Sequence, residues 1–197
     1  MEHPSGMVFV GCGFLFVGNL GKVPFSALMR ASEAKQVPNS PGAVILDGVV
    51  VESVVATAAD VGVPAARGAE LLAAYQRWEA DATSKRFGWP PLRISHTGAL
   101  NLRPLADIPV VAWEYEIPGD RELLGQKVAR VGYLSAAIDD AVFTLAVPLS
   151  PGQDVNFAVG KAASAMQTIK RLPRPLDLVD VSEEVKRNPG RWPDCDR

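Results

Sequence analysis

The dipeptide Asp47-Gly48 stands between two runs of aliphatic residues, Ala43-Val44-Ile45-Leu46 and Val49-Val50-Val51. A two-residue type I′ turn needs positive φ at both central positions, and Asp-Gly is one of the pairs that supplies it. The sequence therefore predicts a β-hairpin over residues 43–57. Because its apolar residues are nearly continuous, we expect the hairpin to be covered on both faces or to lie in the middle of a sheet.

Residues 92–147 have a period of two, which is typical of half-buried strands. The clearest alternation sets apolar side chains against Ala112, Glu114 and Glu116. The apolar members are Val111, Trp113, Tyr115 and Ile117. Pro118-Gly119-Asp120 is expected to turn the chain, and strands are expected near 126–134 and 141–147. We interpret 92–147 as an antiparallel meander.

Three segments have helical spacing instead. Residues 22–35 are predicted to form a short helix with Pro24 in its first turn, and residues 63–82 a longer helix opened by Pro64. A third helix is expected to start at Asp154, as its cap, and to run through Lys170. The predicted fold class is α+β: an antiparallel sheet, made of hairpin 43–57 and meander 92–147, with two or three helices packed on one face.

The ends of the chain differ from its middle. Residues 1–21 are expected to form an apolar N-terminal segment, residues 22–172 a single α+β domain, and residues 173–197 a Pro-rich C-terminal arm with one helical turn at 182–187. Met7 to Leu20 is fourteen residues without a charge. That is short for a membrane-spanning helix, which needs about 20 residues. It can be a buried strand or pair of strands, or an anchor.

Cys12 supports the anchor interpretation. Phe9-Val10-Gly11-Cys12 resembles the lipobox of bacterial lipoproteins, which makes Cys12 a candidate for lipidation. The sequence departs from that pattern because no Lys or Arg precedes the segment and the residues after Cys12 are apolar. The alternative is a buried thiol in an apolar strand.

Composition argues against several classes of function. The net charge is −2, so a large phosphate-binding surface is not expected and nucleic acid is an unlikely partner. The chain has two cysteines, Cys12 and Cys195, and two histidines. We expect no metal and no cofactor, and whether the cysteines pair is left open.

Two motifs within the apolar segment fail on specific residues. Residues 15–20, LFVGNL, resemble the RNP2 strand of RNA-recognition motifs, but the nearest RNP1-like stretch runs into Pro90-Pro91, which a central strand does not accommodate. A dinucleotide or phosphate-binding loop would need glycine at Phe16, and a P-loop would also need Ser or Thr at Val23. Glycines that relieve crowding in a packed strand are the simpler explanation.

Aromatic side chains on the strands suggest a pocket. Ser95 and His96 alternate to opposite faces of a strand and cannot form a nucleophile–base pair directly. A ligand pocket near His96 is the alternative, with Glu114 and Glu116 as an acidic patch beside it. Its expected lining residues are Trp89, His96, Trp113, Tyr115 and Tyr133.

The expected order helix, hairpin, helix, strands, helix resembles the roadblock and longin-like family of small α/β platforms, on residues 45–51 and the helix after them. The C-terminal half, strands followed by a helix, resembles periplasmic lipoproteins of the PsbP or DcrB type. Both resemblances imply assembly or binding rather than catalysis.

The sequence shows no convergent catalytic set, so we expect a non-enzymatic binding or assembly protein. A protein partner or homo-oligomer is expected, and membrane contact would come through residues 7–20. The cell envelope or a large assembly is favoured over a free cytoplasmic location. The alternatives are a structural subunit of a viral or secretion-type assembly, and a small enzyme or ligand binder that uses the pocket near His96.

Overall fold

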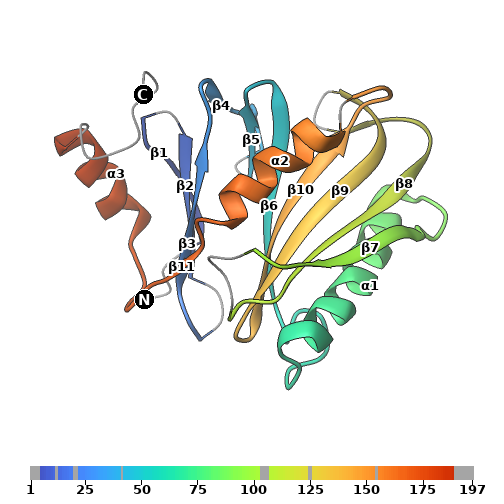
Figure 1. Cartoon of the computed structure of the whole chain (residues 1–197), viewed down its shortest axis with the longest axis horizontal. Coiled ribbons are helices and arrows are strands. Elements are labelled where there is room, and N and C mark those ends of the chain that lie inside the picture. Colours follow the sequence, from blue (N-terminus) through green and yellow to red (C-terminus); the bar gives the residue numbers. More distant parts are fainter. Residues whose placement is uncertain are drawn as a thin grey trace.

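The computed structural model describes residues 5–11, 13–19, 22–40, 42–102, 107–123, 126–153 and 155–188. Among them, the strands form two antiparallel sheets (Figure 1). The small sheet contains, in spatial order, β1 (Gly6–Phe9), β2 (Gly13–Gly18), β3 (Phe25–Arg30) and β11 (Lys170–Arg171). The large sheet contains β4 (Ala34–Gln36), β5 (Ala43–Leu46), β6 (Val49–Thr57), β10 (Ala141–Leu149), β9 (Gln126–Ile138), β8 (Val110–Leu123) and β7 (Ile94–Leu100). The helices are α1 (Gly68–Phe87), α2 (Val155–Met166) and α3 (Leu178–Arg187).

The predicted α+β class, the hairpin and the meander are confirmed. Asp47 and Gly48 have φ of 50° and 80°, as a type I′ turn requires, and β5 pairs with β6 directly across them. The hairpin lies inside the large sheet, because β4 pairs with β5 on one side and β10 with β6 on the other. The meander β7–β8–β9–β10 then completes the sheet through antiparallel neighbours.

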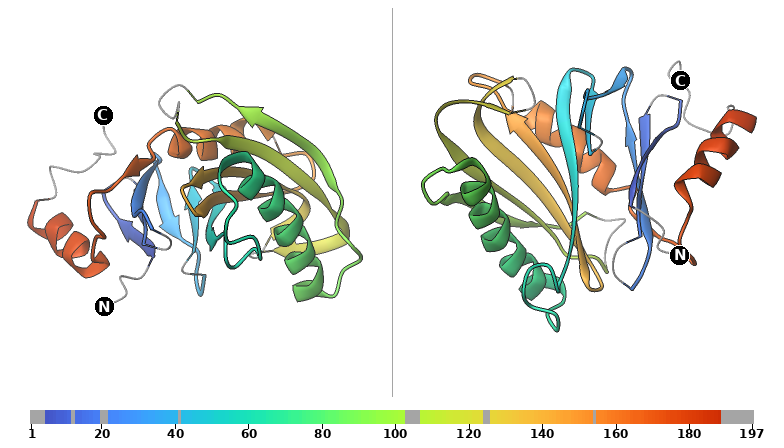
Figure 2. Two further views of the ribbon diagram at one scale, coloured as in Figure 1. Left: turned by 90° about the horizontal axis from the view of Figure 1, so that it is seen from below. Right: turned by 180° about the vertical axis from the view of Figure 1, so that it is seen from behind.

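The expectation that the helices share one face of the sheet is wrong. Strand β10 shows why, since it is buried along its whole length. Its side chains alternate between two clusters: Phe143 and Leu145 belong to the cluster that contains α2, and Val142 and Ala146 to the cluster that contains Tyr75 of α1. The helices therefore cover opposite faces, and the two views of Figure 2 show them on either side of the large sheet.

The predicted helix over residues 22–35 is also wrong, because this segment contains β3 and β4. Phe25, Ala27 and Met29 are buried while the residues between them are partly exposed, which is a period of two. The side chains at Leu28 and Ala31 only happened to match helical spacing. The first helix of the roadblock-like order is thus a strand.

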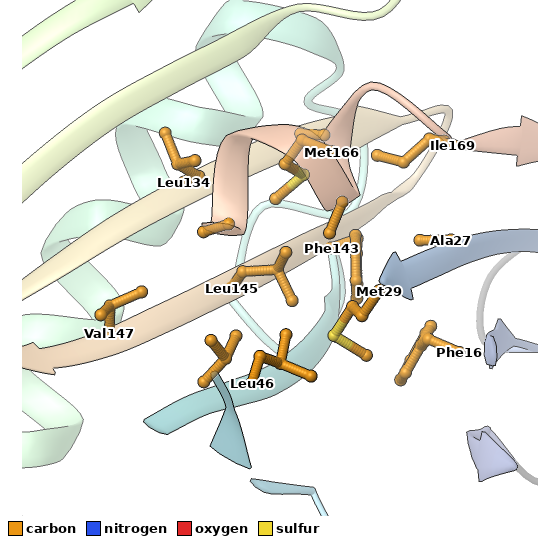
Figure 3. Close-up of a cluster of buried hydrophobic side chains, with 14 of the residues drawn as sticks. Phe16, Ala27, Met29, Leu46, Leu134, Phe143, Leu145, Val147, Met166 and Ile169 are labelled. Carbon is orange, nitrogen blue, oxygen red and sulfur yellow. The ribbon is translucent and has the colours of Figure 1, made fainter. Parts of the chain in front are cut away.

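Strands β1 and β2, residues 6–9 and 13–18, pair with each other, so the apolar N-terminal stretch contains a pair of strands. Phe16 packs against Phe25 and Phe143, with ring centroids 5.9 and 4.7 Å apart, and so joins the small sheet to the large one. Figure 3 shows this shared core, which Met166 of α2 closes.

A glycine relieves crowding at this junction, as expected. A Cβ on Gly13 would lie 2.1 Å from the carbonyl oxygen of Met29 on the neighbouring strand. A side chain at position 13 cannot be accommodated by a rotamer change of a neighbour, because the clashing atom belongs to the backbone.

The remaining differences lie at the ends of elements. Pro118-Gly119-Asp120 does not end the strand: β8 continues to Leu123 past a register shift, with Gly119 at a φ of 73°. Helix α1 begins at Gly68 instead of Val63 and runs to Phe87, where Gly88 caps it with a φ of 64°.

Helix α2 ends at Met166, before the predicted Lys170, and the expected cap Asp154 lies outside the described residues. After it, the Leu28 backbone N–H donates to the Thr168 hydroxyl at 2.7 Å, which ties the exit of α2 to β3. In the tail, α3 is longer than the expected single turn, because the Asp177 carboxylate caps it by accepting from the Val179 N–H.

Candidate functional site

A pocket of about 480 Å³ lies between α1 and the face of the large sheet that α1 covers. We call it the α1 pocket. It combines aromatic, aliphatic and charged side chains from five elements. Its lining residues are Glu52 and Val54 of β6; Trp78, Glu79, Ala82, Thr83, Arg86 and Phe87 of α1; Tyr115 and Glu122 of β8; Val131 and Tyr133 of β9; and Ala146 and Pro148 of β10.

Strand register brings these side chains together. Tyr133 lies opposite Ala146, which lies opposite Glu52, so one row of paired positions crosses β9, β10 and β6. In the neighbouring row, Tyr115 lies opposite Val131, which lies opposite Pro148. Since side chains alternate between faces, every second residue along each strand points to the same side of the sheet. Glycine at position 132 and leucine at 134 belong to the other face, where α2 packs.

Two tyrosines form the floor of the pocket. The hydroxyls of Tyr115 and Tyr133 lie 2.5 Å apart, and both side chains are buried in the fold. The Tyr133 ring stacks on Trp113 with a centroid distance of 4.0 Å, and Trp113 donates from Nε1 to the Ser135 hydroxyl at 3.0 Å. Burial raises the pKa of both tyrosines, so their hydroxyls stay protonated and act as hydrogen-bond donors.

Tyr75 of α1 lies next to Trp113, with ring centroids 6.3 Å apart. Its side chain is fully buried, and its hydroxyl oxygen has no hydrogen-bond partner of normal geometry among the described residues. Its pKa is raised by burial first and then by the charge of Glu79. A buried hydroxyl without a well-formed hydrogen bond lowers the stability of the fold.

Two carboxyl groups, Glu52 and Glu79, are partly buried in the pocket wall. Burial is the main cause that raises the pKa of each. The Thr83 hydroxyl donates to Glu79 Oε1 at 3.2 Å and opposes that rise, while the charge of Glu52 adds to it. Within the described part of the chain, no Lys, Arg or His forms an ion pair with either group.

Arg86 is the basic residue of the lining. Its charge lowers the pKa of both Glu52 and Glu79 without contacting them as an ion pair. The guanidinium lies 5.4 Å from the centroid of the Phe87 ring, and both side chains are exposed at the end of α1. Trp78 is half-buried, with its ring centroid 5.9 Å from that of Tyr75. The rim thus combines aromatic rings with one guanidinium, which lies over the Phe87 ring.

The structure brings together two of the five expected pocket residues, Tyr115 and Tyr133. Trp113 is buried beside them on the same face of the sheet and does not line the pocket. Trp89 packs on Phe87, with ring centroids 4.7 Å apart, just beyond the end of α1. The backbone of His96 pairs with Glu114 on β7 and β8, and its side chain lies outside the described residues, as does Cys12, the lipidation candidate.

Sequence reasoning missed the acidic members of the site. Neither Glu79, in the helix predicted over residues 63–82, nor Glu52, in the predicted hairpin, is among the expected site residues. A signal for Glu52 did exist, since it is the one charged residue in the run from Val49 to Ala58. A carboxylate within an otherwise apolar strand indicates either a strand edge or a functional pocket.

The acidic patch expected at Glu114 and Glu116 lies on the other face of β8 from Tyr115. Glu114 is 3.5 Å from Arg130 of β9, so a cross-strand ion pair already uses it. Among the described residues, no cluster of three or more His, Cys, Asp or Glu side chains is arranged to hold a metal ion. None of the helices in the described ranges is long and apolar enough to cross a membrane.

Comparison with known proteins gives no relative. No family model matches the chain, and neither a curated protein nor a solved structure matches it significantly.

Proposed function

We propose that this chain is a non-enzymatic binding protein that takes a small molecule into the α1 pocket. The observation that supports this most is the combination of a concave, largely aromatic and aliphatic site with a few converging polar groups. Pockets of roughly 300–1,000 Å³ with that composition are typical of small-molecule sites. The polar groups are the Tyr115 and Tyr133 hydroxyls and the Glu52 and Glu79 carboxyls.

Binding fits these groups better than catalysis. The described lining contains no cysteine, serine or histidine, and its tyrosines have raised pKa values, which disfavours them as nucleophiles or bases. A carboxyl with a raised pKa is a candidate acid or base, yet Glu79 already accepts from Thr83. The expected protein partner, homo-oligomer and membrane contact remain predictions alongside this proposal.

The proposal predicts that fragments bind at one place and that filling the pocket stops them. The test is a ligand-observed NMR screen of the whole chain with a library of small aromatic and aliphatic fragments. Ala82 lines the pocket, so Ala82→Trp should occupy it. Ala73 is exposed on the same helix and does not line the pocket, which makes Ala73→Trp the matched control.

The expected result is a set of fragments that bind the wild type and Ala73→Trp but not Ala82→Trp. Thermal unfolding of both variants checks that they remain folded. Fragments that bind all three proteins equally, or no binding fragment at all, would contradict the proposal.

A further inference from the structure

We propose that the ligand of the α1 pocket is an organic cation: an ammonium or amidinium group on an apolar or aromatic body. This inference rests on the proposed function, because it concerns the same pocket. It depends on the charges of the lining, on the absence of ion-pair partners for Glu52 and Glu79 among the described residues, and on the aromatic groups around them.

The charges of the described lining do not balance. Glu52, Glu79 and Glu122 contribute three carboxyl groups, and Arg86 contributes one cation. Partly burying a carboxylate without a partner is unfavourable, and proteins normally offset that cost with a cation or with hydrogen bonds. Here neither Glu52 nor Glu79 has an ion-pair partner among the described residues, so the site is short of positive charge.

The aromatic groups indicate what kind of cation fits. Tyr115 and Tyr133 line the floor, and Trp78 and Phe87 line the wall and rim. Aromatic faces attract organic cations through their quadrupoles, and they tolerate an apolar body at the same time. A bare metal ion would instead need several convergent oxygen ligands, which the described residues do not offer.

Arg86 shows how a positive charge acts on these carboxyls. Its guanidinium lies over the Phe87 ring at the rim, and its field already lowers the pKa of both carboxyls. An ammonium or amidinium group of a ligand, bound deeper in the pocket, would likewise lower the pKa of Glu52 and Glu79. Binding of the cation and loss of a proton from Glu52 or Glu79 should therefore favour each other.

The titratable and charged groups that face these carboxyls come from three of the five elements around the pocket, because the lining residues of β10 are apolar and β6 contributes Glu52 itself. They are Arg86 and Tyr75 of α1, Tyr115 and Glu122 of β8, and Tyr133 of β9. The tyrosines have raised pKa values and stay neutral around pH 7, so Glu52 and Glu79, whose pKa values burial raises, are the groups whose charge changes as the pH rises past the ordinary carboxyl range. Affinity for a cation should consequently increase over the same rise in pH.

The test compares three probes of nearly equal size: 2-phenylethylammonium, 2-phenylethanol and phenylacetate. Protein NMR titrations at pH 7 give the dissociation constant of each for the whole chain. We expect the ammonium to bind roughly tenfold more tightly than the alcohol, and the anion to bind least. Glu52→Gln and Glu79→Gln should each remove most of that difference and leave the alcohol unchanged.

Glu70→Gln is the matched control, because Glu70 is exposed in the first turn of α1 and does not line the pocket. It should leave all three constants unchanged. Equal affinity for the ammonium and the alcohol, with both lost in Ala82→Trp, would overturn the choice of a cation and leave the proposed function standing. Tighter binding of phenylacetate would also overturn it and assign the site to anions through Arg86. Binding of none of the probes, with no hit from the fragment screen, would overturn both proposals.

Discussion

The hydroxyl groups of Tyr115 and Tyr133 lie 2.5 Å apart on neighbouring strands at the floor of the α1 pocket. Because both side chains are buried, removing one hydroxyl leaves the other without its partner. We expect Tyr115→Phe and Tyr133→Phe each to lower the free energy of unfolding by about 1–3 kcal/mol. The double variant should cost clearly less than the sum of the two, because it leaves no orphaned hydroxyl. Urea denaturation of the four proteins measures this coupling, and strictly additive effects would show that the two hydroxyls are independent.

Glu52 should reduce stability at neutral pH. Its pKa is raised by burial, so the folded protein binds a proton more tightly than the unfolded chain does. Its favourable contribution is therefore fully present below the unfolded pKa and is lost as the pH rises through the folded pKa. We expect Glu52→Gln to increase stability at pH 7 by about 1 kcal/mol and to give little gain near pH 4. Chemical denaturation at the two pH values checks the sign. A gain confined to low pH would contradict this prediction.

Asp47, in contrast to Glu52, should stabilise the fold at neutral pH and lose that effect in acid. Burial tends to raise its pKa, but hydrogen bonds from Lys161 and from the Glu33 backbone N–H outweigh that and lower it. Its contribution is thus present above the unfolded pKa and is lost as the pH falls through the folded pKa. Replacing Lys161 by Met removes the ion pair between α2 and the hairpin turn. The expected loss is about 1 kcal/mol or less at pH 7, shrinking toward pH 3. A loss that stays constant over this range would mean that packing and not charge is responsible.

Gly13 and Gly98 provide a test of how the strands pack. A Cβ at Gly13 would meet the Met29 carbonyl oxygen, whereas nothing lies within 4 Å of a Cβ at Gly98. Gly13→Ala should therefore destabilise the fold by roughly 1–3 kcal/mol, and Gly98→Ala should be close to neutral. Thermal unfolding of the two variants compares them directly. Equal melting temperatures would show that β2 and β3 are not in this contact.

The local parts of the fold could be predicted from the sequence, and the long-range parts could not. The turn at Asp47-Gly48 follows from two residues, because only a few pairs accept positive φ at both positions. Residues 22–35 were assigned the wrong period, since Leu28 and Ala31 match a helix while Phe25, Ala27 and Met29 match a strand. Pairing with β2 decides in favour of the strand, and that contact is not visible in the segment itself.

The same limit applies to the candidate site. Alternation along β8 places Tyr115 on a buried face, but it does not say which helix covers that face. The charge of Glu52 acts on Glu79 only because α1 packs over β9 and β10 of the large sheet. Neither carboxyl is unusual within its own segment apart from the apolar neighbours of Glu52. The pocket therefore depends on which helix covers which face of the sheet. The sequence pattern predicts the sheet and its helices, but it does not determine that arrangement.

The most direct measurement for the central claim is a map of contacts between a bound probe and the protein. Isotope-filtered NOE spectra of the wild-type chain with 2-phenylethylammonium report which side chains lie within about 5 Å of the ligand, which is close to the distance at which side chains are in contact. The account predicts NOEs from the phenyl protons to the Tyr115 and Tyr133 rings and from the methylene protons to the Thr83 methyl group. NOEs to the small sheet or to α3, with none to these three residues, would contradict it.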